Sequence, residues 1–147
     1  MQPTFFIRNL IYFISITSNL VLGFFVFLKE RKGKINRTFF FTVSFANLWL
    51  ISLFLFHTLE EPRWILWVGR FNFAVILPML YYLLRFVVIF PREIVFLPKK
   101  FEIGLRSWLF LFTILTFLTP LISKEEIIIG AGQRETIYGP LYSLYVF

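Results

Sequence analysis

The chain of 147 residues carries 59% hydrophobic residues, 22 phenylalanines and a formal net charge of +7. A soluble domain of this length does not bury so much apolar surface, so the composition indicates a membrane protein whose main partner is the lipid bilayer. The basic residues lie mostly in two short segments between apolar runs, where the positive-inside rule accounts for them, so we expect no nucleic-acid binding. Without cysteine, and with a single histidine, the sequence offers no thiolate or histidine cluster, and we expect no metal, no cofactor and no catalytic centre.

Four apolar runs are long enough to cross a membrane, since a helix rises about 1.5 Å per residue and the hydrocarbon core is about 30 Å thick. The predicted spans are residues 9–28, 39–59, 69–90 and 107–123, and the eight residues 140–147 begin a fifth. The predicted fold is an all-α, polytopic transmembrane helix bundle, and residues 1–147 form one membrane domain. Because eight residues do not cross a membrane, we expect this chain to be the front part of a longer protein. The first run is too long for a signal peptide and lacks a cleavage site after it, so we expect it to be retained.

The charges of the connecting segments predict the orientation of the chain. Residues 29–38 hold five basic residues against one acidic residue, and residues 91–106 hold four against two. The positive-inside rule places both segments in the cytoplasm, and the N-terminus therefore outside. Residues 60–63 and 124–139, which carry a small excess of acidic residues, then lie outside. The predicted location is the cytoplasmic (inner) membrane of a bacterium.

The outer segment 124–139 differs in composition from the rest of the chain. It has β-branched residues on both sides of a glycine-containing stretch, which predicts a small extracellular β-hairpin. We expect the three isoleucines at 127–129 to pair with Ile137 and to form an ordered cap over the helix ends. Whether such a cap senses a stimulus or only seals the bundle stays open at this point.

Four candidate structural residues lie inside the predicted membrane spans, namely Asn47, Asn72, Pro78 and Arg85. Hydrocarbon offers no hydrogen-bond partner, so we expect Asn47 to face protein, and an interhelical hydrogen bond is favoured over a ligand contact. Pro78 predicts a kink, because it lacks the N–H and frees a carbonyl one turn earlier. Arg85 lies five residues before Phe90 and is expected to snorkel to the cytoplasmic headgroups, the alternative being an intramembrane functional charge.

Smaller signals concern the helix ends and one helix face. Gly33 is expected to end the first helix, and Asn36 or Thr38 to cap the second by accepting a hydrogen bond from its first turn. Small and polar residues, Gly23 among them, recur along one face of the first span. This pattern favours close helix packing over a ligand site.

Several short motifs follow one another along the chain: Asn36 before an aromatic run, Leu48 with Trp49, the W-x-x-R at 67–70, Leu77 with Pro78, Phe90 with Pro91, and YGPLY at 138–142. In this order they resemble the amino-terminal seven-helix membrane region of many bacterial sensor histidine kinases. The resemblance covers nearly the whole chain, through the start of the fifth helix. It implies a sensory region of a two-component system, a homodimer through the full-length protein, and a PAS, kinase or other output domain after the membrane region. It supplies no ligand-binding residues, and no output motif lies in the chain, which itself is expected not to be an enzyme.

Two other classes of membrane protein remain as alternatives. A transporter subunit or fragment would favour charged or broken helices at the midplane; apart from Pro78 none is evident in the sequence. A small structural or assembly protein, complete in itself, is the second alternative, and the abrupt end at Phe147 argues against it.

Overall fold

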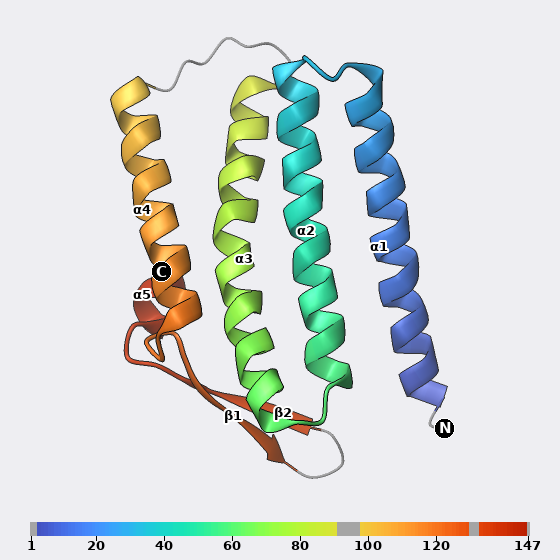
Figure 1. Cartoon of the computed structure of the whole chain (residues 1–147), viewed down its shortest axis with the longest axis vertical. Helices are drawn as coiled ribbons and strands as arrows, with labels where there is room; N and C mark the ends of the chain where they lie inside the picture. Colours follow the sequence, from blue (N-terminus) through green and yellow to red (C-terminus); the bar gives the residue numbers. More distant parts are fainter. Residues whose placement is uncertain (1–2, 91–97, 130–132, 147) are drawn as a thin grey trace.

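The computed structural model describes residues 3–90, 98–129 and 133–146. Four long helices lie side by side in chain order (Figure 1): α1 Pro3–Lys29, α2 Lys34–Thr58, α3 Pro62–Ile89 and α4 Lys99–Leu118. Within the described residues all four are long and apolar enough to cross a membrane. The predicted number of complete spans is therefore confirmed, and the chain is a multi-pass membrane protein.

The buried apolar side chains gather on α3 and at the joint between α4 and the strand that follows it. They include Ile65, Ala74, Val75, Leu77, Tyr81 and Ile122. Helix α3 packs against α2 on one side and α4 on the other. The apolar side chains of α1 are instead largely exposed, as at Phe25 with 73%, and in a membrane this surface faces lipid.

Helices α1 and α2 approach closely at a glycine. Gly23 is buried, and a Cβ placed on it would lie 3.2 Å from Val43 Cγ1. Small residues at helix contacts let backbones come together, which is a common basis of packing between membrane helices. The contact agrees with the expected small-residue face of the first span.

Helix α2 begins earlier than expected, at Lys34 with Gly33 as its N-cap, and the predicted capping by Asn36 or Thr38 is wrong. Thr38 Oγ1 donates to the Lys34 carbonyl at 2.8 Å, the usual bond of a threonine inside a helix. Asn36 Nδ2 donates to the Val26 carbonyl at 3.0 Å. Asn36 therefore ties the start of α2 to the last turns of α1.

Prolines explain most of the other helix boundaries. Helix α3 begins at Pro62, seven residues before the expected start, since a proline fits the first turn where its missing N–H is not needed. Helix α4 begins at Lys99, directly after Pro98, and ends at Leu118, just before Pro120 in the sequence. A proline disfavours helical geometry in the residue before it. The expected span 107–123 is therefore displaced, and the assignment of residues 99–106 to a loop is wrong.

The segment after α4 forms two antiparallel strands, β1 Ser123–Ile129 and β2 Gln133–Tyr138, followed by the short helix α5 Tyr142–Val146. The connection at 130–132 lies outside the described residues. The register places Glu125, not an isoleucine of 127–129, opposite Ile137, so the expected isoleucine pairing is wrong. Strand β1 packs against α3. The pair of strands lies at the end of the bundle where α2 turns into α3 (Figure 1).

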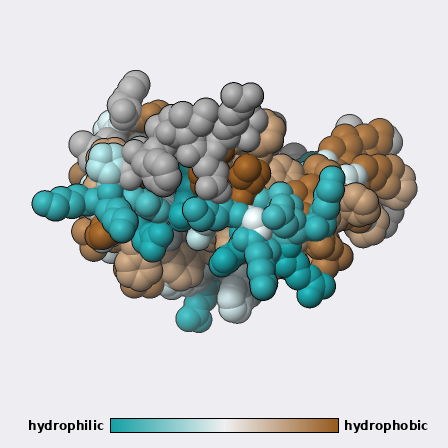
Figure 2. All heavy atoms as spheres, turned by 90° about the horizontal axis from the view of Figure 1, so that it is seen from above, coloured by the Kyte–Doolittle hydropathy of each residue, from teal (hydrophilic) through white to brown (hydrophobic). Residues whose placement is uncertain are grey.

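The opposite end of the bundle is basic. Its exposed cationic side chains come from two segments far apart in sequence: Lys29, Arg31, Lys32, Lys34, Arg37, Lys99, Lys100 and Arg106. Figure 2 views this end and shows hydrophilic side chains gathered over the apolar helices. The two segments whose charges predict a cytoplasmic location therefore lie at the same end of the molecule.

Candidate functional site

A closed set of hydrogen bonds joins α2 to α3 near the middle of both helices. Trp49 Nε1 donates to Asn72 Oδ1 at 3.0 Å, and Asn72 Nδ2 donates to Ser52 Oγ at 3.0 Å. Ser52 Oγ in turn donates to the Trp49 carbonyl at 2.7 Å. Within hydrocarbon such groups must find partners in the protein, and here each side chain does. We call these three residues the Asn72 network; it fixes the rotation of α2 against α3.

Asn47 lies on α2 in a different environment. Its side chain is only 3% exposed, so protein covers it, but neither its Oδ1 nor its Nδ2 has a hydrogen-bond partner among the described residues. Along α2 it shares a helical face with Val43 and Phe54, which lie near Gly23 and Tyr12 of α1, and not with Phe45 and Trp49, which contact α3. Asn47 therefore lies on the side of α2 toward α1. The expected interhelical hydrogen bond is not formed, and a buried amide of this kind is costly.

Pro78 lies within α3, which stays helical on both sides of it. Since proline has no N–H, the carbonyl of Ala74 loses its usual partner. The neighbouring carbonyl, that of Phe73, accepts a hydrogen bond from the Tyr145 hydroxyl of α5 at 2.7 Å. The Phe73 and Tyr145 rings also meet edge to face, with 5.8 Å between their centroids. The C-terminal segment is thereby attached to α3 just before the proline.

A second bond attaches the strands to the same half of α3. Arg70 Nε donates to the carbonyl of Ser123, the first residue of β1, at 3.2 Å. The guanidinium carbon of Arg70 lies 5.7 Å from the centre of the Trp67 ring, a cation–π distance that holds the side chain in place. Two residues of the W-x-x-R motif thus position the strand pair against α3.

Arg85 lies at the other end of α3 and contacts α4. Its Nη1 is 3.3 Å from Glu102 Oε1, and the Tyr81 hydroxyl donates to the same oxygen at 3.4 Å. Arg106 Nη2 lies 3.6 Å from that oxygen as well. The Arg85 and Glu102 side chains are 35% and 28% exposed, so solvent and headgroups screen the pair. Arg85 therefore joins two helices at the basic end, which the expectation of simple snorkelling did not include.

The structure does not gather the four predicted residues into one pocket. Asn72 and Pro78 lie on α3, Asn47 lies on the side of α2 toward α1, and Arg85 lies about two helical turns beyond Pro78. The sequence alone does not predict the contacts of Glu102 and Tyr145. It places Glu102 in a segment expected to be a loop, on the same predicted side of the membrane as Arg85, and that shared side is the one sequence feature that suggests their pairing.

Comparisons with protein-family models, with curated proteins and with solved structures find no match to this chain. Among the residues that the structure describes, no group of three His, Cys, Asp or Glu side chains is placed to hold a metal ion.

Proposed function

We propose that this chain is the membrane-embedded sensory input region of a bacterial signal-transduction protein, of the kind found in the sensor histidine kinases that it resembles. In this proposal the bundle lies in the cytoplasmic membrane with its N-terminus outside. The pair of strands is an outer cap, α5 begins the fifth helix, and the output domain follows in the full-length protein, which forms a homodimer.

The observation that carries the proposal is the set of contacts along α3. At one end Arg70 and the Phe73 carbonyl hold β1 and α5, and at the other end Arg85 pairs with Glu102 of α4. Pro78 lies between these two sets of contacts. A helix attached to the cap at one end and to the basic end at the other is a physical route for coupling the two sides of a membrane.

The two sides of α2 are bonded unequally, as expected of an element with two arrangements. The Asn72 network bonds α2 to α3, whereas the Asn47 amide, on the side of α2 toward α1, is buried without a partner among the described residues. A second rotation of α2 that gives Asn47 a hydrogen bond in exchange for one bond of the network would differ little in free energy from this one, since membrane hydrogen bonds are worth about 0.6 kcal/mol on average. A stimulus at the cap that binds one arrangement better would shift the balance between them.

The distribution of charge supports the proposed orientation. Most of the exposed basic side chains gather at the end remote from the strands (Figure 2). With this end in the cytoplasm, the strand pair lies outside, where a stimulus from the environment can reach it.

The experiment that tests the function is to read the coding sequence beyond Phe147 and to measure the output of the full-length protein in membranes. A sensor kinase predicts a transmitter domain and ATP-dependent phosphorylation of a histidine. It also predicts that Tyr145→Phe, which removes the hydroxyl bond to α3, changes the basal phosphorylation rate, whereas Tyr142→Phe on the same helix, which keeps the ring contact with Phe73, serves as the matched control. A stop codon after Phe147, or an output that Tyr145→Phe does not move, would contradict the proposal.

A further inference from the structure

The contact between α3 and α4 at the basic end holds more positive charge than its carboxylate balances. Arg85 Nη1 and Arg106 Nη2 lie 3.3 Å and 3.6 Å from the same Glu102 oxygen. Helix α4 contains one acidic residue, Glu102, so the two guanidiniums share a single carboxylate. Neither guanidinium is closed off, because the Arg85 and Arg106 side chains are 35% and 63% exposed. Net positive charge therefore remains at the surface, near the ends of two membrane helices.

Lys99 adds a third cation at this place. It lies three residues before Glu102 in α4, and Arg106 lies four residues after Glu102. Residues at these spacings share one face of a helix, so Lys99 and Arg106 lie on the face that carries Glu102. The Lys99 side chain is exposed. We call Arg85, Lys99 and Arg106 the α3–α4 basic cluster.

The same face of α4 also carries exposed apolar side chains. Ile103 lies between Lys99 and Arg106 along this face, and Phe110 lies one turn beyond Arg106, deeper in the membrane. Ile103 and Phe110 are 64% and 68% exposed. Cations at headgroup depth next to exposed apolar side chains fit an amphiphile with an anionic head. A phosphate ion or an acidic peptide in water would match the cations and leave the apolar part uncovered.

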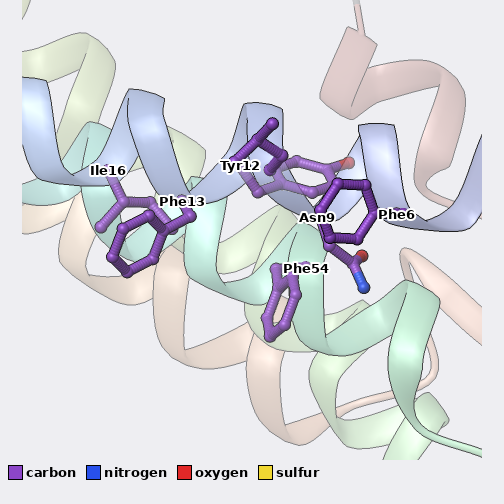
Figure 3. Close-up of a pocket in the computed structure, with 7 residues that line it drawn as sticks. Phe6, Asn9, Tyr12, Phe13, Ile16 and Phe54 are labelled. Atoms are coloured by element: carbon purple, nitrogen blue, oxygen red, sulfur yellow. The ribbon is translucent and has the colours of Figure 1, made fainter.

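A hollow of about 340 Å³ between α1 and α2 shows what the charge adds (Figure 3). It lies toward the other end of the bundle, where the strands are, and Phe13 at its rim is as exposed as Phe110. Its lining contains no charged side chain. Acyl chains can cover such a surface, but nothing in it distinguishes one lipid headgroup from another. The hollow is therefore an internal reference for the basic cluster.

From these features we infer that the α3–α4 basic cluster binds an anionic phospholipid of the surrounding bilayer. The lipid phosphate lies against Lys99 and Arg106, with Arg85 beside it, and the acyl chains lie along Ile103 and Phe110. Hydrogen bonds from arginine to phosphate are charge-assisted and strong, and basic clusters next to membrane helices attract acidic lipids. The inference concerns lipid binding alone and does not depend on the proposed sensory function.

The test places the fluorophore bimane on one introduced cysteine, because the chain has no cysteine of its own. Phe110→Cys reports on the basic cluster, and Phe13→Cys, at an equally exposed position, reports on the α1–α2 hollow. Each labelled chain is placed in phosphatidylcholine nanodiscs with a small fraction of nitroxide-labelled lipid, either phosphatidylglycerol or phosphatidylcholine. A nitroxide on the acyl chain quenches a nearby fluorophore, so the ratio of quenching by the two lipids measures the preference for the anionic head.

The preference for phosphatidylglycerol is expected to be at least about fivefold at position 110 and absent at position 13. About fivefold is the factor expected from one basic residue near an acidic headgroup. Equal quenching by the two lipids at position 110, or an equal preference at position 13, would overturn the inference.

Three variants of the Phe110→Cys chain separate a lipid site from general charge. Arg106→Gln is expected to lower the preference about fivefold, whereas Arg31→Gln, the same change at an exposed position of the other basic segment, is expected to leave it within about twofold. Glu102→Gln is expected to raise the preference about fivefold, because it removes the carboxylate that competes with the lipid for Arg85 and Arg106. Helical content and elution volume show that each variant is folded.

Other outcomes would contradict the inference in distinct ways. Equal losses with Arg31→Gln and Arg106→Gln would show a diffuse surface charge in place of a site. A lower preference with Glu102→Gln would show that the carboxylate does not compete with the lipid. Release of phosphatidylglycerol by millimolar glycerol phosphate in the buffer would show a site for phosphate in water.

Discussion

Trp49 and Asn72 are joined across the α2–α3 contact by a hydrogen bond of 3.0 Å between the indole nitrogen and the amide oxygen. The same amide gives its N–H to Ser52, so one side chain of α3 satisfies two of α2. Both α2 residues lie on the face toward α3, which sets the rotation of α2. This relationship makes Asn72 the residue of the predicted set on which the bundle most depends.

Replacement of Asn72 by Leu is expected to destabilise the bundle. The change removes two interhelical bonds and leaves the Trp49 N–H buried without an acceptor, a loss of about 1–2 kcal/mol. Unfolding by SDS in mixed micelles measures this loss of stability. Ser18→Leu, at an exposed position of α1, is the control, with an expected change near zero. Equal stability of Asn72→Leu and the unaltered chain would mean that the network contributes nothing.

Replacement of Asn47 by Leu is expected to raise stability. Sequence reasoning alone predicts a mild loss, because it assumes an interhelical hydrogen bond; the structure shows a covered amide that has no partner in the described part of the chain. Removing that unsatisfied group with a side chain of the same branching should gain about 1 kcal/mol. Unfolding in the same mixed micelles shows whether the free energy of unfolding rises or falls. A loss of stability would show that Asn47 is hydrogen-bonded in the membrane.

The pair Arg85 and Glu102 is expected to show measurable coupling. A double-mutant cycle with Arg85→Met and Glu102→Gln should give about 0.2–1 kcal/mol, since both side chains are partly exposed. Raised ionic strength should reduce it, because salt screens exposed charges. Absent coupling at low salt would mean that Arg85 reaches the headgroups without engaging α4.

The Gly23 contact predicts a steric effect that can be reversed. Gly23→Val places side-chain atoms where Val43 already lies, at a Cβ distance of 3.2 Å, and overpacking of this kind costs about 1–3 kcal/mol. Val43→Ala in the same chain should recover most of the loss. If Val43→Ala does not relieve Gly23→Val, the two helices do not meet at this point.

The number of spans was predictable because it depends on the length of apolar runs, which the sequence shows directly. The early start of α4 was not predictable, because the segment KKFEIGLR is as rich in charged residues as a loop. Lysines and arginines at a helix end reach the headgroups, so this composition also suits the first turns of a membrane helix. The side chains that contact Asn72 and Arg85 were also not predictable from the sequence. A run of apolar residues shows that a helix crosses the membrane, whereas its rotation depends on packing against neighbours.

The most direct test of the proposed orientation uses single cysteines in this cysteine-free chain. Lys32 and Glu135 are both exposed and lie at opposite ends of the bundle. With an impermeant thiol reagent, Glu135→Cys should be labelled in intact cells, and Lys32→Cys only after the membrane is permeabilised. Labelling of Lys32→Cys in intact cells, with Glu135→Cys protected, would contradict a sensor whose strand pair faces the outside.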